Sequence, residues 1–154
     1  MVVELRDEVV RLVQLIWAQT LEREVRPVGR DAMKIEGEEA ITASVHVTGA
    51  WNGMISIRSR YSDAAAIASH MFAIPVDELT REEIHDAFAE IANITGGNIK
   101  GVLPGMSSLS LPTIVEGSDY EIVLATRSPT LAMQFESEGT MIEIKVVEQG
   151  SIRG

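Results

Sequence analysis

The segment TREEIHDAFAEIANITGGNIKGVLPGMSSLSLP, residues 80–112, decides the fold of this chain. A helix advances by about 100° per residue, so positions three and four apart share one face. One such face, a strip roughly 60° wide, carries Asp86, Glu90, Asn93 and Gly97. The opposite face carries Ile84, Phe88, Ile91 and Thr95. The pattern predicts a helix that buries one side and presents a carboxylate and a carboxamide, one turn apart, on the other.

Local signals set the limits of this helix. Thr80 and Glu83 form a capping-box pattern, with Thr80 at the N-cap, and Pro104-Gly105 closes the helix. Gly96 and Gly97 together cost a helix about 2 kcal/mol relative to alanine. Close packing against a neighbour, or the approach of a partner, must therefore offset that cost.

The rest of the chain alternates between helical and strand periodicity. The predicted helices run from about Val3 to Glu24, stopped by Arg26–Gly29, and from a Ser62 cap through Ala73, broken by Pro75. Residues 41–48 alternate apolar and polar side chains, which predicts a half-buried strand that returns through a Gly49–Gly53 hairpin into Met54–Arg58. Further strands are predicted over Ser107–Glu116, Tyr120–Thr126, Leu131–Glu136 and Met141–Glu148.

This order of elements predicts an α+β fold in which an antiparallel sheet packs against helices, because adjacent strands with short turns pair antiparallel. At 154 residues and 16.8 kDa the chain fits one domain, residues 1–154.

Composition excludes several classes of function. The chain has no cysteine, which rules out disulfides and thiolate metal sites. Its net charge of −10 opposes a sequence-independent hold on nucleic acid or an anionic membrane. No signal peptide and no membrane-spanning apolar run is evident, so a soluble cytoplasmic protein is expected.

Two other candidate sites are weak. The three histidines, His46, His70 and His85, lie on different predicted elements without a close metal-binding spacing, so no metal site is expected. The glycine-rich stretch Gly96–Gly101 follows a helix rather than a strand and lacks the order of a phosphate-binding loop.

The segment DAFAEIANITGGNIKGVLPG followed by LSLPTIVEG resembles the chemotaxis phosphatase family of CheC, CheX and the related flagellar-switch phosphatase. The shared motif is Asp or Ser, three residues, Glu, two residues and Asn, with a downstream Pro. Its positions here are Asp86, Glu90, Asn93 and Pro112. Only one copy is present, whereas CheC-like proteins typically carry two, and Pro112 lies nearer to the Asn than in that branch.

The CheX branch is the most similar. Gly97, Asn98 and Lys100 follow the motif Asn as in CheX, and residues 47–53 and 69–72 are also similar. The resemblance spans roughly residues 1–150 and implies the same α+β fold.

The resemblance implies a phosphatase that acts on a phosphorylated CheY-like receiver domain, which brings its own aspartyl phosphate, Mg²⁺ and Lys. Asn93 would orient the attacking water and Glu90 would pair with the receiver Lys, with Asp86, Gly97 and Lys100 in supporting or docking roles. No cofactor of the chain's own is expected. The alternative is a non-catalytic module that binds or sequesters a receiver; a small-molecule enzyme ranks third.

CheX-like proteins form dimers by joining or exchanging strands. The predicted last strand, Met141–Glu148, contains no Pro and alternates apolar and charged residues. We therefore expect a homodimer that uses this strand as an edge; the alternative is that Glu143, Lys145 and Glu148 protect a solvent-exposed edge.

Overall fold

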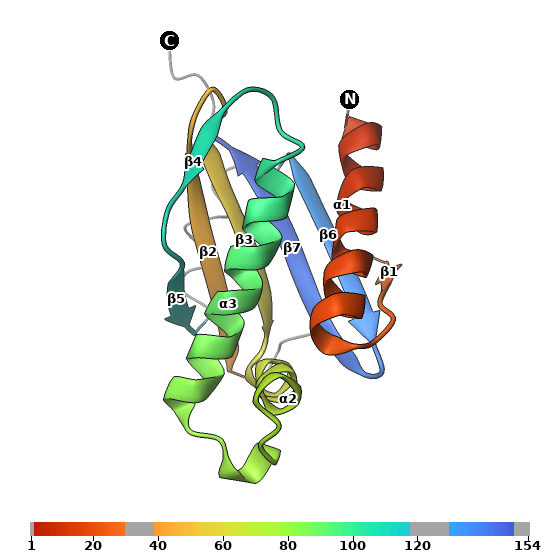
Figure 1. The fold of residues 1–154 in the computed structure, drawn as a ribbon, viewed down its shortest axis with the longest axis vertical. Helices are drawn as coiled ribbons and strands as arrows, with labels where there is room; N and C mark the ends of the chain where they lie inside the picture. Colours follow the sequence, from red (N-terminus) through yellow and green to blue (C-terminus); the bar gives the residue numbers. More distant parts are fainter. Residues whose placement is uncertain (1, 30–38, 118–129, 150–154) are drawn as a thin grey trace.

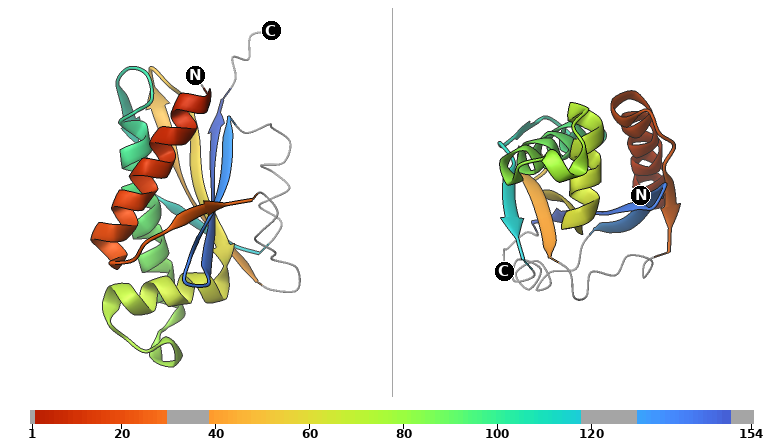
Figure 2. Two further views of the ribbon diagram at one scale, coloured as in Figure 1. Left: turned by 90° about the vertical axis from the view of Figure 1, so that its right-hand side faces the viewer. Right: turned by 90° about the horizontal axis from the view of Figure 1, so that it is seen from below.

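A computed structural model describes residues 2–29, 39–117 and 130–149 of the chain. Within them, seven strands form one antiparallel sheet in the order β1-β6-β7-β3-β2-β4, and β5 pairs with β2 as well. The strands are β1 (Arg26–Val28), β2 (Ala40–Gly49), β3 (Gly53–Arg60), β4 (Ser107–Leu109), β5 (Thr113–Glu116), β6 (Leu131–Ser137) and β7 (Thr140–Glu148). Three α-helices lie on one face of the sheet (Figures 1 and 2), which confirms the predicted α+β fold.

The first helix, α1 (Val2–Ile16), continues as one π-helical turn over Trp17–Leu21. It ends where Glu22 adopts a left-handed backbone with φ of 56°. The sequence predicted that Arg26–Gly29 only stops this helix. Arg26–Val28 instead forms β1 and pairs with β6, a contact that no local pattern reveals.

The second helix, α2 (Tyr61–Phe72), follows β3 with no connecting loop. Its N-cap is Arg60 and not Ser62, so the predicted cap is wrong. Arg60 Nε donates instead to Asp63 Oδ2 at 2.8 Å, which ties the end of the strand to the first helical turn. A 3₁₀ turn, Val76–Glu78, then leads from Pro75 into the third helix.

The third helix, α3 (Arg81–Lys100), has the predicted capping box. The Glu83 N–H donates to Thr80 Oγ1 at 3.1 Å, and the Thr80 N–H donates to Glu83 Oε1 at 2.9 Å. Two backbone donors at the start of the helix are thereby satisfied, and the start of α3 is fixed.

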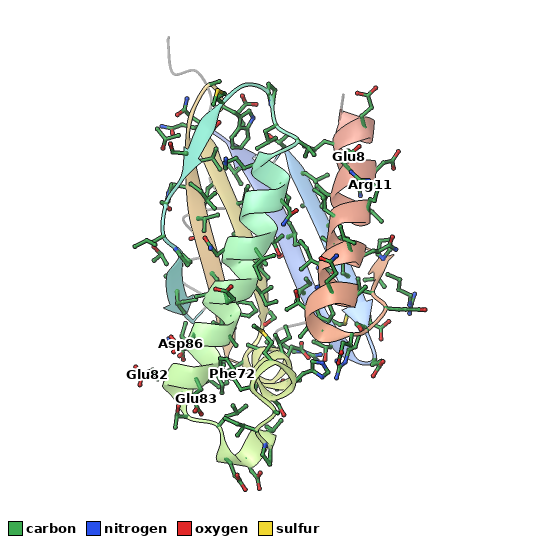
Figure 3. The ribbon with its side chains drawn as sticks, viewed as in Figure 1. Glu8, Arg11, Phe72, Glu82, Glu83 and Asp86 are labelled. Carbon is green, nitrogen blue, oxygen red and sulfur yellow. The ribbon has the colours of Figure 1, made fainter. Side chains whose placement is uncertain are left out.

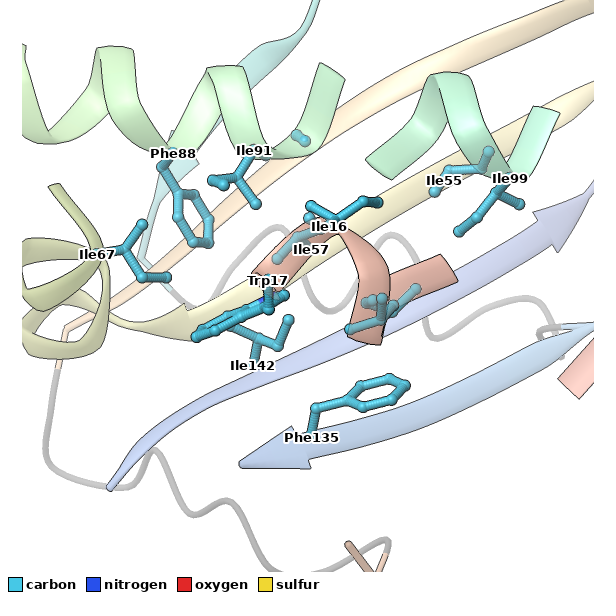
Figure 4. Packing of buried hydrophobic residues seen from close by; sticks show 14 of the residues in the cluster. Ile16, Trp17, Ile55, Ile57, Ile67, Phe88, Ile91, Ile99, Phe135 and Ile142 are labelled. Carbon is cyan, nitrogen blue, oxygen red and sulfur yellow. The ribbon is translucent and has the colours of Figure 1, made fainter. Parts of the chain in front are cut away.

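The hydrophobic core lies between the helices and the sheet (Figure 4). Its largest fully buried side chains include Trp17, Phe88 and Phe135, surrounded by isoleucines from β3, β7, α2 and α3. Phe88 and Ile91 point from α3 toward the sheet, as the apolar face of the sequence pattern predicted.

The β2–β3 hairpin is confirmed, but β2 is buried on both faces in its first half. Thr42 and Ser44 are buried, although alternation predicted that they face solvent. Neighbouring strands on the face away from the helices also carry enclosed polar groups, among them Ser56 and an Arg58–Glu143 ion pair of 3.6 Å. Long charged side chains cover the small hydroxyl side chains beside them on this face. Polar residues are therefore buried here, which a pattern of apolar and polar residues does not predict.

The predicted strand Ser107–Glu116 is in fact two strands separated by a β-bulge. β4 pairs Val47 with Leu109, whereas β5 pairs Ser44 with Thr113. Two residues of β2 therefore oppose the three residues 110–112, one more than regular pairing allows. Pro112 lacks an N–H and cannot donate to a ladder, which explains the interruption.

β7 lies inside the sheet between β6 and β3, and both flanking ladders extend along most of its length. The expectation that Met141–Glu148 is a free edge is therefore wrong. Alternation of apolar and charged residues identified the strand but not its neighbours. The other predicted strand, Tyr120–Thr126, lies outside the described residues.

Candidate functional site

The polar strip of α3 forms an exposed face on a firmly packed helix. We use "α3 strip" for Asp86, Glu90, Asn93 and Gly97. The first three are exposed, and Ile84, Phe88, Ile91 and Thr95 on the opposite side are all buried. Asp86 projects from the left side of α3 in Figure 3. The two faces predicted from the sequence are thus confirmed, and the strip is held by a helix that cannot easily rotate.

The motif side chains have no partner within the part of the chain that the structure describes. No hydrogen bond or ion pair in those residues involves the side chains of Asp86, Glu90 or Asn93. Asn98, by contrast, donates to the Ile94 carbonyl at 2.8 Å. The carboxylate of Glu90 and the carboxamide of Asn93 therefore remain available to a partner.

The two glycines of α3 have different surroundings. A Cβ on Gly96 would lie 2.6 Å from Val45 Cγ2, so the helix can approach β2 closely only because this residue is glycine. A Cβ on Gly97 would meet its nearest neighbour, Leu109 Cδ2, at an ordinary 3.9 Å. The predicted packing reason is confirmed for Gly96, whereas nothing described in the fold requires a glycine at 97.

Lys100 lies at the end of α3, and its ammonium group donates to the Ser107 carbonyl at 3.2 Å. This bond ties the end of the helix to the start of β4. The side chain is half-buried, so it holds the local structure in place beside the strip.

A charged cluster at the start of α3 was not expected from the sequence. The Arg81 guanidinium and His85 Nε2 both contact the carboxylate of Glu116 in β5, and Arg81 also lies 4.8 Å above the ring of Tyr61. The hydrogen bond from Arg81, with a smaller contribution from His85, lowers the pKa of Glu116 to about 2, although burial opposes the shift. Neither spacing nor periodicity relates residue 116 to residues 81 and 85. The pairing of β5 with β2 brings Glu116 next to the start of α3.

Metal-binding groups do not gather near the strip. His46 is on β2, His70 on α2 and His85 on α3, and the described residues contain no group of three or more His, Asp or Glu side chains arranged to hold a metal ion. The described helices also include none with the length and apolar character needed to cross a membrane.

A hollow of about 570 Å³ lies elsewhere, between α1 and the segment that follows α3. Its lining includes Trp51, Leu103 and Glu148, and neither Glu90 nor Asn93 contributes to it. The strip is thus an open helix face, a shape that suits a protein surface better than an enclosed small molecule.

Comparison with family models gives a direct match. Residues 41–136 match the family model described as chemotaxis phosphatase CheX, and this range includes all of β3, α2 and α3 and nearly all of β2. The chain belongs to the CheX family. No curated protein matches the sequence in the corresponding comparison.

Solved structures share the CheX fold along nearly the whole chain. The chemotaxis protein CheX from Vibrio vulnificus is 18% identical with a TM-score of 0.71, and the match covers 97% of this chain and 99% of that one. CheX in a CheX–CheY–BeF₃–Mg²⁺ complex from Borrelia burgdorferi is 19% identical, with a TM-score of 0.68 and coverage of 97% and 99%. FliY from Thermotoga maritima is 16% identical, with a TM-score of 0.62 and coverage of 94% and 86%.

Proposed function

We propose that this protein accelerates hydrolysis of the aspartyl phosphate on a CheY-like receiver domain. The observation that carries the proposal is the Glu90–Asn93 pair, exposed and unpartnered among the described residues, on a helix whose opposite face is buried. Membership of the CheX family supports it. The similar fold in the Borrelia burgdorferi complex, in which CheX binds CheY, supports the choice of partner.

The chemistry requires little from the helix beyond positioning. Water attacks the phosphorus, the bond to the aspartyl oxygen breaks, and the products are inorganic phosphate and the receiver carboxylate. A carboxamide offers both a donor and an acceptor, so Asn93 holds this water in line with the bond that breaks. Placement of this kind is worth several kcal/mol of the roughly 7–11 kcal/mol known for well-oriented reactions.

Glu90 has the complementary role of docking. One turn from Asn93, its carboxylate pairs with the active-site Lys of the receiver and sets the register of the complex. Asp86 extends the same negative face by one further turn. Mg²⁺ belongs to the receiver in this scheme, so the chain needs no cofactor of its own.

Asn93→Ala tests the catalytic role. Receiver domains encoded in the same genome are labelled with acyl phosphate, and phosphate loss is timed with each variant. We expect Asn93→Ala to lower the acceleration about 10²-fold or more, because misplacing a reacting group by 1 Å costs about that factor. Receiver binding and thermal stability should stay close to wild type, since the side chain is exposed. Glu90→Ala should weaken both binding and turnover.

Asn98→Ala is the matched control, because it removes an exposed carboxamide from the same helix outside the strip. If the Asn93→Ala protein accelerates phosphate loss as much as the Asn98→Ala protein does, the water-orienting role of Asn93 is refuted. Wild-type protein that binds the phosphorylated receiver without speeding phosphate loss would instead identify a sequestering module.

A further inference from the structure

The β-bulge at residues 110–112 is held firmly on β2. The Ser110 N–H donates to the His46 carbonyl at 2.9 Å, and Ser110 Oγ accepts from the His46 N–H at 2.9 Å. Pro112 fixes the backbone on the other side of the bulge, and β5 resumes pairing at Thr113. Bulges of this kind re-aim a side chain beside functional sites.

The side chain between these two anchors is Leu111, which is 86% exposed. Covering this leucine by a partner is favourable because it removes apolar surface from water. The backbone is already fixed, so binding costs little conformational entropy here. Its neighbours in sequence account for the geometry of the bulge but give no intramolecular reason for an apolar residue at this position.

The bulge lies beside the α3 strip. Val45 of β2 is opposite the bulge, and the same Val45 side chain packs beneath Gly96 of α3. Leu109, just before the bulge, lies within 3.9 Å of the positions that Cβ atoms on Gly96 and Gly97 would occupy. In Figure 1 the connection between β4 and β5 runs along the outer edge of β2. Residues 110–112 are thus linked, through Leu109 before them and Val45 opposite them, to the turn of α3 that begins at Asn93.

We propose that Leu111 is a second contact with the receiver domain. It determines both the affinity for the receiver and the choice among receivers. This inference rests on the proposed function. The partner it fits is a receiver with a lysine facing Glu90 and a shallow apolar depression next to its phosphorylated aspartate. The strip itself supplies charge and a carboxamide but almost no apolar area. Leu111 adds beside the strip an apolar side chain, 86% exposed, that a partner can remove from water.

Leu111→Ser tests the proposal, with Met106→Ser as the matched control. Met106 is 89% exposed and lies before β4, at the other end of that strand from the bulge. The first readout is the Kd for a receiver held in its phosphorylated form by BeF₃⁻ and Mg²⁺. The second is KM and kcat for phosphate loss from the labelled receiver.

Leu111→Ser should raise Kd and KM about 10- to 100-fold, the effect of losing a buried leucine from an interface, and leave kcat within about twofold. Met106→Ser should change neither. Equal Kd values for the two variants would overturn the proposal even if Asn93→Ala behaves as expected. Absence of any wild-type acceleration would refute the phosphatase activity, while the BeF₃⁻ titration would still decide the role of Leu111. If Leu111→Ser lowers the molar mass of the protein in solution, the bulge is a contact between copies of this chain and the proposal is overturned.

Discussion

Gly97 follows Asn93 by one helical turn and leaves the surface of α3 without a side chain at that point. The neighbouring Gly96 has a structural reason, the close contact with Val45, that Gly97 lacks. Glycine at a helix position costs about 1 kcal/mol of stability relative to alanine. Because no packing contact among the described residues requires Gly97, we expect the backbone of a partner to approach closely here.

Gly97→Ala should therefore stabilise the protein and impair its function. We expect the free energy of unfolding to rise by up to about 1 kcal/mol, because the new methyl group has ordinary contacts and alanine favours the helix. Acceleration of receiver dephosphorylation should fall at least about tenfold, since the methyl group holds the receiver away from Asn93. Urea unfolding and the phosphate-release assay measure the two effects.

Gly96→Ala provides the contrast. A Cβ only 2.6 Å from Val45 Cγ2 forces either the stiff Val45 side chain or the helix to move, so this variant should lose about 1–3 kcal/mol of stability. A Gly97→Ala protein that is more stable and fully active would show that the strip tolerates bulk at this position and that no partner approaches it closely.

At the scale of elements, β5 is joined to α3 by the Arg81–Glu116–His85 cluster. Because β5 begins directly after the bulge, this cluster also helps fix the bulge relative to the α3 strip. The cluster is partly exposed, with Arg81 about half accessible, so solvent screens its ion pairs. Its effect on stability is modest but depends on pH in a defined direction.

Glu116→Gln should flatten the acid limb of the stability profile. The folded pKa of Glu116, about 2, lies below its ordinary value of 4.5, so its contribution is present above pH 4.5 and is lost as the pH falls toward 2. We expect a loss of about 1 kcal/mol at pH 7 after allowance for screening. Glu39 acts in the opposite sense, because a hydrogen bond to Glu116 raises its pKa. Urea unfolding from pH 7 to pH 2.5 measures the difference; parallel profiles for wild type and variant would contradict it.

Sequence patterns predicted the features of this protein that depend on residues close together in the sequence. The capping box at Thr80 and Glu83 and the two faces of α3 follow from spacing within one helix. The pairing of Arg26–Val28 with β6, the central place of β7 and the contact of His85 with Glu116 join segments distant in sequence. Leu111 appeared to be an ordinary strand residue, because a bulge is defined by the register of two strands and not by the sequence of one.

For the whole molecule, the homodimer stays a prediction, but its interface has to differ from the expected one. β7 is already paired on both sides, and among the described strands the outer edges are β1 and the β4–β5 side of β2. The β4–β5 side carries Leu111, the proposed receiver contact, so β1 is the edge available to a second copy, although Pro27 removes one donor from it. Sedimentation equilibrium at micromolar concentration should give a mass near twice 16.8 kDa. A mass of 16.8 kDa at every concentration would show a monomer.

The central position of β7 also determines the order in which the protein can fold. β3 pairs Gly53 with Glu148, so the hairpin made early in synthesis waits for the last described strand before its second edge is covered. Until then β1 also lacks its partner, because β6 is made late as well. Such long-range closure is slow, and the nascent chain meanwhile exposes the strand that carries Ile55 and Ile57. The β2–β3 hairpin and β6 become parts of one sheet only when β7 fills the position between them.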